Sequence, residues 1–185
     1  MIGRGQGLGQ IYVRTASVSC HSLPMRKRAR KLWLMKSEPD VYSIDDLERD
    51  RSQSWDGVRN YQARNFMREM ALGDLAIFYH SSAKPPGAAG VCRICREAYP
   101  DPTQFDDKSE YYDPKSDEES PRWWMVDVEL VEKFPELVSL ETMKHDRKLQ
   151  GMRVTQKGSR LSVQPVDEKH FKRVLELAGA KTKLR

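Results

Sequence analysis

The chain has 185 residues, 38% of them hydrophobic and 32% charged, a composition typical of one globular domain with a real core. No stretch approaches the roughly 20 consecutive apolar residues of a membrane span, so we expect no membrane partner. Residues 1–31 hold seven of the 32 basic residues and no acid, which leaves 25 basic against 27 acidic residues in the rest. A nucleic-acid site in that near-neutral remainder must therefore be a local patch.

The N-terminal segment, residues 1–30, is expected to be a basic extension outside the folded domain, which should span residues 31–180 before a basic tail, 181–185. Its glycine-rich, then basic, acid-free composition is typical of a flexible arm and of an organellar transit peptide. A third alternative is an over-extended start, because Met25 opens a basic run just before the first predicted strand. The segment has no long apolar region, so secretion is not expected.

The three cysteines, Cys20, Cys92 and Cys95, form no disulfide framework. Cys92 and Cys95 lie three apart in a predicted strand, so their side chains should face opposite sides of it. The four histidines are scattered along the chain. We expect no metal, no organic cofactor and an intracellular location, the cytoplasm in a bacterium or the nucleus in a eukaryote.

Hydrophobic runs and capping residues predict the elements in chain order. In the first half we expect strands at residues 32–35, 75–79 and 89–97, and helices that start after Ser43 and run from Tyr61 to Leu72, closed by Gly73. In the second half we expect a long acidic loop at 99–121, the longest strand at 123–134, a helix capped by Ser139, a short strand at 160–163 and a last helix between Asp167 and Gly179. This order predicts an α+β fold or a small barrel with a mostly antiparallel sheet.

The stretch from Trp55 to Asn65 differs from an ordinary loop or helix start. It holds two aromatic residues, two arginines, two asparagines and a glycine, with few residues suited to a core. Aromatic faces can stack on a flat ring, and the amides and guanidinium groups can read its hydrogen-bonding edge. This mixture favours a planar, polar ligand such as a nucleobase.

Five blocks in the same order resemble the EVE domain, a PUA-like family. They are Lys36-Ser37-Glu38-Pro39, Trp55 to Asn65, Phe78-Tyr79-His80-Ser81, Tyr111-Tyr112-Asp113-Pro114 and Arg160-Leu161-Ser162-Val163-Gln164-Pro165. The resemblance runs from about Leu32 to Gly179. It implies a mixed, largely antiparallel β pseudo-barrel with short flanking helices. It also implies a pocket for a modified base, such as 5-methylcytosine or 5-hydroxymethylcytosine in DNA, and no established catalysis.

A base that is flipped out of a duplex needs flat walls, groups that read its edge, and contacts for the phosphate. Trp55, Tyr61 and Trp123 are the candidate walls. All candidate base-binding residues together are Ser37, Trp55, Asp56, Val58, Asn60, Tyr61, Asn65, Tyr79, Ser81, Trp123 and Ser162. The candidate contacts to phosphate or backbone are Lys36, Arg59, Arg64 and Arg160.

Several of these residues have structural alternatives that the sequence leaves open. Trp55 could cover the edge of the core, and Asn60 could be only the N-cap of the helix that follows. Arg59 and Arg64 could pair with the acidic loop. His80, which follows a buried strand, is more often a structural histidine than a catalytic base.

The sequence predicts a monomeric module that binds nucleic acid, DNA rather than RNA, through a modified base and without catalysis. Base extrusion costs a few kcal/mol, and stacking returns roughly 1–3 kcal/mol per base, so backbone contacts must supply the affinity. The alternatives are an RNA-binding module, a scaffold that binds protein through the acidic loop, or a nucleic-acid- or nucleoside-processing enzyme. In an enzyme, Glu38, Asp56 and His80 would form the acid–base set.

Overall fold

A computed structural model of the chain describes residues 29–184, so the predicted extension over residues 1–30 lies almost wholly outside the described residues. The strands are β1 (Leu32–Ser37), β2 (Ser52–Trp55), β3 (Leu75–His80), β4 (Gly87–Pro100), β5 (Trp124–Ser139) and β6 (Val163–Pro165). The helices are α1 (Ile44–Asp50), α2 (Tyr61–Glu69), α3 (Leu140–His145) and α4 (Glu168–Leu177), with 3-10 turns η1 (Pro102–Gln104), η2 (Arg147–Leu149) and η3 (Arg153–Thr155). No helix within residues 29–184 is long and apolar enough to cross a membrane.

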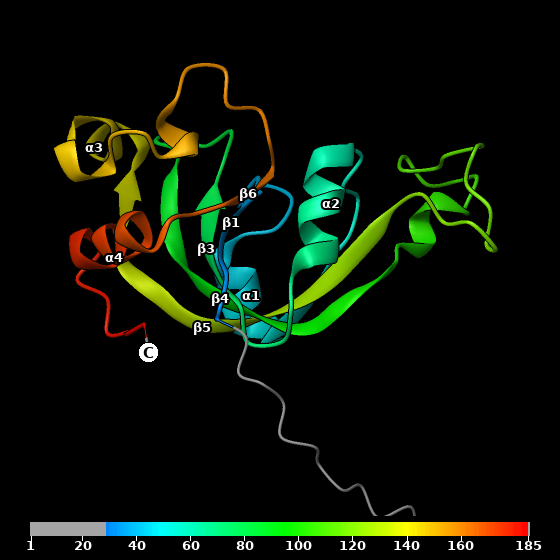
Figure 1. Cartoon of the computed structure of the whole chain (residues 1–185), viewed down its shortest axis with the longest axis horizontal. Helices are drawn as coiled ribbons and strands as arrows, with labels where there is room; N and C mark the ends of the chain where they lie inside the picture. The colour runs from blue at the N-terminus through cyan, green and yellow to red at the C-terminus, as the bar shows by residue number, and fades with distance from the viewer. Residues whose placement is uncertain (1–28, 185) are drawn as a thin grey trace, which may run out of the picture.

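The six strands form one mixed sheet in the order β2-β5-β4-β3-β1-β6. Only β1 and β3 pair in parallel, and the other four pairs are antiparallel. The long strands β4 and β5 curve together across the molecule (Figure 1), with α3 and α4 near one end and the loop 101–123 at the other. The α+β class and the mixed, mostly antiparallel sheet are confirmed.

The two faces of the sheet bury two separate hydrophobic clusters. In β1, Trp33 and Met35 belong to one cluster, and Leu32 and Leu34 belong to the other. This alternation follows from the two-residue period of a strand, and burial on both faces explains why β1 is a continuous apolar run. The first cluster is covered by α1 and α2, and the second by α3, α4 and the η turns.

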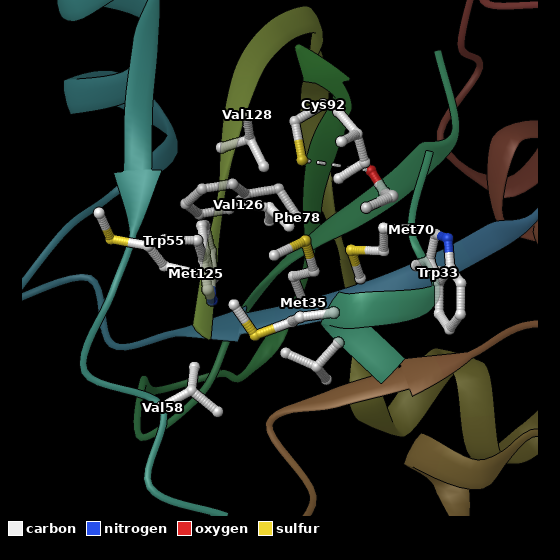
Figure 2. Packing of buried hydrophobic residues seen from close by; sticks show 14 of the residues in the cluster. Trp33, Met35, Trp55, Val58, Met70, Phe78, Cys92, Met125, Val126 and Val128 are labelled. Carbon is white, nitrogen blue, oxygen red and sulfur yellow. Dashed lines mark hydrogen bonds between the residues drawn. The ribbon is translucent and has the colours of Figure 1, made fainter. Parts of the chain in front are cut away.

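The sheet curls without closing. β2 and β6 are its two edges and are not hydrogen-bonded to each other. Yet Gln53 and Trp55 of β2 line the same pocket as Ser162, which directly precedes β6. The two edges therefore approach across a seam, as expected of a pseudo-barrel, and the first cluster fills the inside of the curl. Figure 2 shows part of that cluster, with Trp55, Phe78 and Val126 close together.

Most predicted helix boundaries are confirmed. Ser43 and Asp46 form the reciprocal capping box of α1, and the Ser139 Oγ accepts a hydrogen bond from Thr142 N at the start of α3. The second helix is shorter than predicted, because the backbone of Met70 is extended. Gly73, with a φ of 84°, lies in the turn that follows rather than at the helix end.

Several strand predictions need correction, among them the longest strand, which runs to Ser139 rather than ending at residue 134. The strand β2 was missed, because its sequence Ser-Gln-Ser-Trp carries little β-branched or apolar signal at a sheet edge. The last strand is Val163–Pro165, not residues 160–163, since the ladder with β1 begins at Val163. The strand β4 continues to Pro100, so that the acidic loop begins at Asp101.

Candidate functional site

A pocket of about 600 Å³ opens at the seam between the two sheet edges. This volume suits a small planar ligand. Its walls come from the end of β1, the loop before α1, the end of β2 with the residues that follow it, the acidic loop, and the residue before β6. The lining residues are Lys36, Ser37, Glu38, Val41, Tyr42, Gln53, Ser54, Trp55, Asp56, Gly57, Val58, Glu110, Tyr111 and Ser162.

Trp55 belongs both to the pocket and to the core. Its side chain is 8% exposed, and its ring meets that of Phe78 edge to face, with 5.4 Å between the centroids. No residue within 29–184 accepts a hydrogen bond from its indole Nε1. Both interpretations of Trp55 from the sequence therefore hold in part: the ring supports the core edge and also forms a wall of the pocket.

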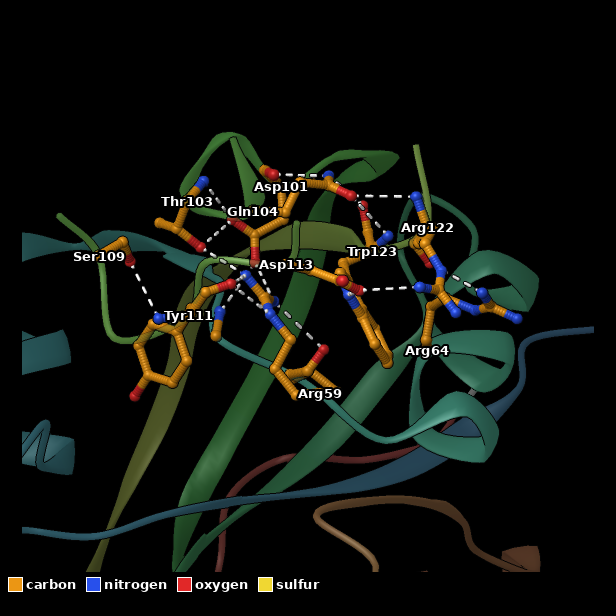
Figure 3. A network of polar contacts seen from close by, with 12 residues as sticks. Arg59, Arg64, Asp101, Thr103, Gln104, Ser109, Tyr111, Asp113, Arg122 and Trp123 are labelled. Atoms are coloured by element: carbon orange, nitrogen blue, oxygen red, sulfur yellow. Dashed lines mark hydrogen bonds and ion pairs between the residues drawn. The ribbon is translucent and has the colours of Figure 1, made fainter. Parts of the chain in front are cut away.

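A buried ion pair holds the loop after Trp55 in place (Figure 3). The carboxylate of Asp101 accepts hydrogen bonds from the Arg59 guanidinium at 2.8 Å and from Gly57 N at 3.0 Å. Arg59 also donates to Tyr111 O and to the Thr103 hydroxyl. Burial alone would raise the pKa of Asp101, but hydrogen bonds from Arg59, Thr103 and Gly57 hold it below its usual range.

Gly57 is required by its position. Its φ is 70°, and a Cβ at this residue would lie 2.8 Å from the Tyr111 ring. The absence of a side chain lets the Tyr111 ring approach the backbone of Gly57 closely at the edge of the pocket. The aromatic wall from the acidic loop and the Trp55 wall from β2 are therefore joined through one glycine.

Hydrogen bonds of Gln104, whose side chain is fully buried, hold the acidic loop in place. Its amide nitrogen donates to Asp101 O and Trp123 O, and its amide oxygen accepts from Trp123 N, Arg122 N and the Ser116 hydroxyl. One buried amide thus satisfies the backbone at both ends of the loop. This arrangement supports Tyr111 where it borders the pocket.

The pocket is acidic. Glu38, Asp56 and Glu110 line it, against one cation, Lys36. Burial lowers the pKa of Lys36, whose Nζ donates to Ser159 O at 2.8 Å. Burial, followed by the nearby charge of Asp101, raises the pKa of Asp56. Negative walls disfavour a phosphate inside the pocket, and carboxylate oxygens can accept hydrogen bonds from an exocyclic amino group of a base.

A second cavity of about 470 Å³, which we call the loop groove, lies between α2 and the segment from η3 to β6. Its lining is Asn60, Gln62, Arg153, Gln156, Lys157, Gly158, Ser159, Arg160, Leu161 and Gln164. It holds the predicted residues Asn60 and Arg160. Asn60 is also the N-cap of α2, because its Oδ1 accepts from Gln62 N and Ala63 N.

Of the residues predicted from the sequence, six line the pocket: Lys36, Ser37, Trp55, Asp56, Val58 and Ser162. Their roles in binding stay predictions. The alternative for Arg59, pairing with the acidic loop, is confirmed, because protein atoms occupy its guanidinium donors.

The other two predicted walls lie away from the pocket. Tyr61 and Trp123 stack on each other with 4.8 Å between the centroids, and Trp123 Nε1 donates to Asp113 at 2.7 Å. Arg64 lies over Tyr61 and donates to Arg122 O at 2.7 Å. Asn65 is exposed on α2, where its Oδ1 accepts from Arg64. These residues form a cluster beside the acidic loop, with Trp123 buried beneath the exposed Tyr61, rather than pocket walls.

Two candidate base-binding residues near β3 lie outside the pocket lining. Tyr79 is buried in the second cluster, where burial raises its pKa to about 12, because odd-numbered residues of β3 face away from the pocket. Ser81 does not line the pocket and instead donates from its hydroxyl to Ser37 O at 3.2 Å. His80 Nε2 accepts from Ile44 N at 3.0 Å, which confirms the structural alternative for this histidine and leaves it outside the pocket lining.

Sequence reasoning missed several lining residues, chiefly Tyr42, Gln53, Ser54, Glu110 and Tyr111. Burial, followed by Asp50, raises the pKa of Tyr42 to about 12, so its hydroxyl is neutral in solution. Tyr111 could have been chosen as a candidate, because it belongs to the Tyr-Tyr-Asp-Pro block, one of the five blocks that resemble the EVE domain. A position within a long acidic loop gave no indication that this ring returns to β2.

The open, curled sheet with short flanking helices and a pocket at its seam defines a PUA-like module. The family model described as "EVE domain" matches residues 31–177, so the chain belongs to the EVE domain family. Human thymocyte nuclear protein 1 is 45% identical over 163 residues, which cover 78% of this chain and 72% of that protein.

Solved structures agree with this assignment. A Pseudomonas putida protein is 49% identical with a TM-score of 0.77, and the match covers 80% of this chain and 99% of that one. Human THYN1 protein, solved in complex with DNA that contains 5-methylcytosine, is 42% identical with a TM-score of 0.77, covering 82% of this chain and 99% of that one. The family and the fold class expected from the sequence are confirmed.

Proposed function

We propose that this protein binds DNA and holds one modified base, a 5-substituted cytosine, in the pocket at the seam. The observation that carries the proposal is the pocket itself: a cavity of about 600 Å³ with a tryptophan wall, a tyrosine wall and three carboxylates. Aromatic faces suit a flat base, and a carboxylate is the partner that the cytosine amino group prefers. The human relative solved with 5-methylcytosine-containing DNA supports the same class of ligand.

Asp56 lines the pocket, where its carboxylate oxygens can accept hydrogen bonds from a base edge. Trp55 offers a free indole N–H within the described chain. One added methyl group on a base is worth roughly 1–3 kcal/mol in a fitted pocket, so we expect about 10- to 200-fold discrimination.

The test is a titration of the full chain against labelled oligonucleotides by fluorescence anisotropy. The set holds cytosine, 5-methylcytosine, 5-hydroxymethylcytosine and N6-methyladenine in single- and double-stranded DNA, with the same sequences as RNA, at two salt concentrations. We expect at least a tenfold preference for one cytosine modification in DNA. Flat binding across the set would contradict the proposal, and a preference confined to RNA would favour the RNA-binding alternative.

The informative variant is Ser162→Phe rather than Trp55→Ala. Removing the Trp55 ring would also empty the core and cost roughly 3–5 kcal/mol of stability, which confuses folding with binding. Ser162 lines the pocket and has no side-chain hydrogen bond to a described residue, so a phenyl ring there should fill the cavity. Ser120→Phe, on the exposed part of the acidic loop, is the matched control. We expect the modification preference to disappear only in Ser162→Phe.

A further inference from the structure

We propose that the loop groove is a phosphodiester-binding site, which holds the backbone of the strand whose base enters the pocket. This inference rests on the proposed function. It assigns to Arg153, Lys157 and Arg160 the contacts to phosphate, and it removes that role from Arg59. The strand would therefore pass over the segment between η3 and β6, not over the acidic loop.

The first argument is charge. Arg153, Lys157 and Arg160 are exposed and line one cavity, and no acidic residue within 29–184 lines it. Among the described residues none of the three has an ion-pair partner. By contrast, Arg59, Arg93, Arg122 and Arg173 each lie beside a carboxylate. Three cations without an ion-pair partner among the described residues surround a groove with a volume of about 470 Å³. They form a local anion site in a domain that is otherwise close to neutral.

The second argument is the nature of the remaining lining. Asn60 and Gln62 bring side-chain amide N–H groups, which can donate to phosphate oxygens, while Asn60 Oδ1 is already used as the cap of α2. Gln164 is buried and donates to Leu161 O, so it supports the wall of the groove instead. The Arg153 guanidinium lies over the Phe66 ring, 5.9 Å from its centroid, which holds the cation at the α2 side of the groove.

The third argument is continuity with the pocket. Lys36 and Ser162 line the pocket, and Lys36 Nζ donates to Ser159 O, which belongs to the groove. Leu161 and Ser162 are adjacent in the chain and line different cavities. A nucleotide whose base lies in the acidic pocket would therefore place its own or a neighbouring phosphate at the basic groove. The two cavities separate the neutral and the anionic parts of one ligand.

The test compares salt dependence in full-length variants. Arg153→Gln with Lys157→Gln removes two cations of the groove, and Lys169→Gln with Lys183→Gln removes two exposed cations near α4 that line neither cavity that we assign to the ligand. Each protein is titrated with single-stranded oligonucleotides that do or do not contain the preferred base, from about 50 to 200 mM salt. The basic N-terminal segment is present in all proteins, so its contribution cancels.

We expect the groove variant to bind every oligonucleotide roughly tenfold more weakly at the low salt concentration, with the slope of log K against log salt reduced by about 1–2. The ratio between modified and unmodified base should stay as in the unchanged protein. An unchanged slope, or an equal change in the α4 variant, would overturn the inference even if the pocket discriminates bases. A reduced slope without any base preference in the unchanged protein would keep the groove and reject the pocket.

Discussion

Two neighbouring regions of the site treat their charges in opposite ways. At the acidic loop, Arg59 and Asp101 bind each other, and further hydrogen bonds from Gly57 and Thr103 complete the network. At the loop groove, the cations have no acidic partner among the described residues, and at the pocket three carboxylates face one lysine. The network at the acidic loop fixes the shape of the pocket. The charges of the loop groove and of the pocket lining stay available to a ligand.

This difference shows why residue type alone does not identify a phosphate contact. Arg59, Arg64 and Arg160 are equivalent candidates in the sequence. In the structure Arg59 is 21% exposed and bound to a buried carboxylate, whereas Arg160 is exposed in a groove without acids. What separates them is the presence of a folded partner, which for Arg59 lies 42 residues away along the chain.

The largest expected effect is on the network. Arg59→Met leaves Asp101 as a buried carboxylate without its cation, which should lower the free energy of unfolding by about 3–5 kcal/mol. Urea unfolding followed by tryptophan fluorescence measures this loss. The matched control is Arg93→Met, because the Arg93–Glu129 pair has the same 2.8 Å separation but lies half exposed on the sheet.

We expect the control to lose less than about 1 kcal/mol, since exposed ion pairs contribute little. Equal losses in the two variants would mean that the Arg59–Asp101 pair is no more structural than a surface pair. In that case Arg59 would return as a candidate phosphate contact, and its effect on the salt slope would become the deciding measurement.

The second largest expected effect is a loss of stability at Gly57, which both contacts Asp101 and lines the pocket. Gly57→Ala places a methyl group against the Tyr111 ring at a φ of 70°, and Gly73→Ala has a φ of 84° with no atom within 4 Å of the new Cβ. Both variants should lose about 1–2 kcal/mol from the left-handed backbone, and only Gly57→Ala should lose more through the clash. The difference between their unfolding free energies, measured side by side, isolates the Tyr111 contact.

Base binding gives the second measure of this variant. Displacement of Tyr111 should lower the affinity for the preferred oligonucleotide in Gly57→Ala. Gly73 does not line the pocket, so Gly73→Ala should bind as the unchanged protein does. Unimpaired binding by Gly57→Ala would show that the tyrosine wall is not used.

The five blocks that resemble the EVE domain predicted the family. Capping residues and hydrophobic periods, which are local signals, predicted most of the helices and all strands except β2. Trp55, Asp56 and Ser162, which belong to these blocks, line the pocket, and their roles in binding stay predictions. The features that the sequence did not predict depend on contacts with segments that are distant along the chain. The position of Tyr79 depends on which face of the sheet the odd-numbered residues of β3 point to. The position of Tyr111 depends on the acidic loop folding back against Gly57. The polar edge strand β2 needed the pairing with β5, which no local pattern encodes.

The smallest effect concerns Asp56, whose folded-state pKa is raised, the opposite of Asp101. For a raised carboxyl pKa, the favourable contribution to stability is present below the unfolded-state value of about 3.9 and is lost as the pH rises through the folded-state value. Asp56→Asn removes this dependence. The variant should therefore be more stable than the unchanged protein at pH 7, by less than about 1 kcal/mol, because Asp56 keeps access to solvent, which screens its charge.

Urea unfolding at pH 3, 5 and 7 tests the sign, with Asp107→Asn on the exposed loop as the control. The advantage of Asp56→Asn should grow as the pH rises above about 4, and the control should change little at any pH. If Asp56→Asn also weakens binding of the modified base, the protein keeps a destabilising carboxylate because the ligand uses it. A variant that is less stable at pH 7 would instead place Asp56 with the charges that hold the fold together.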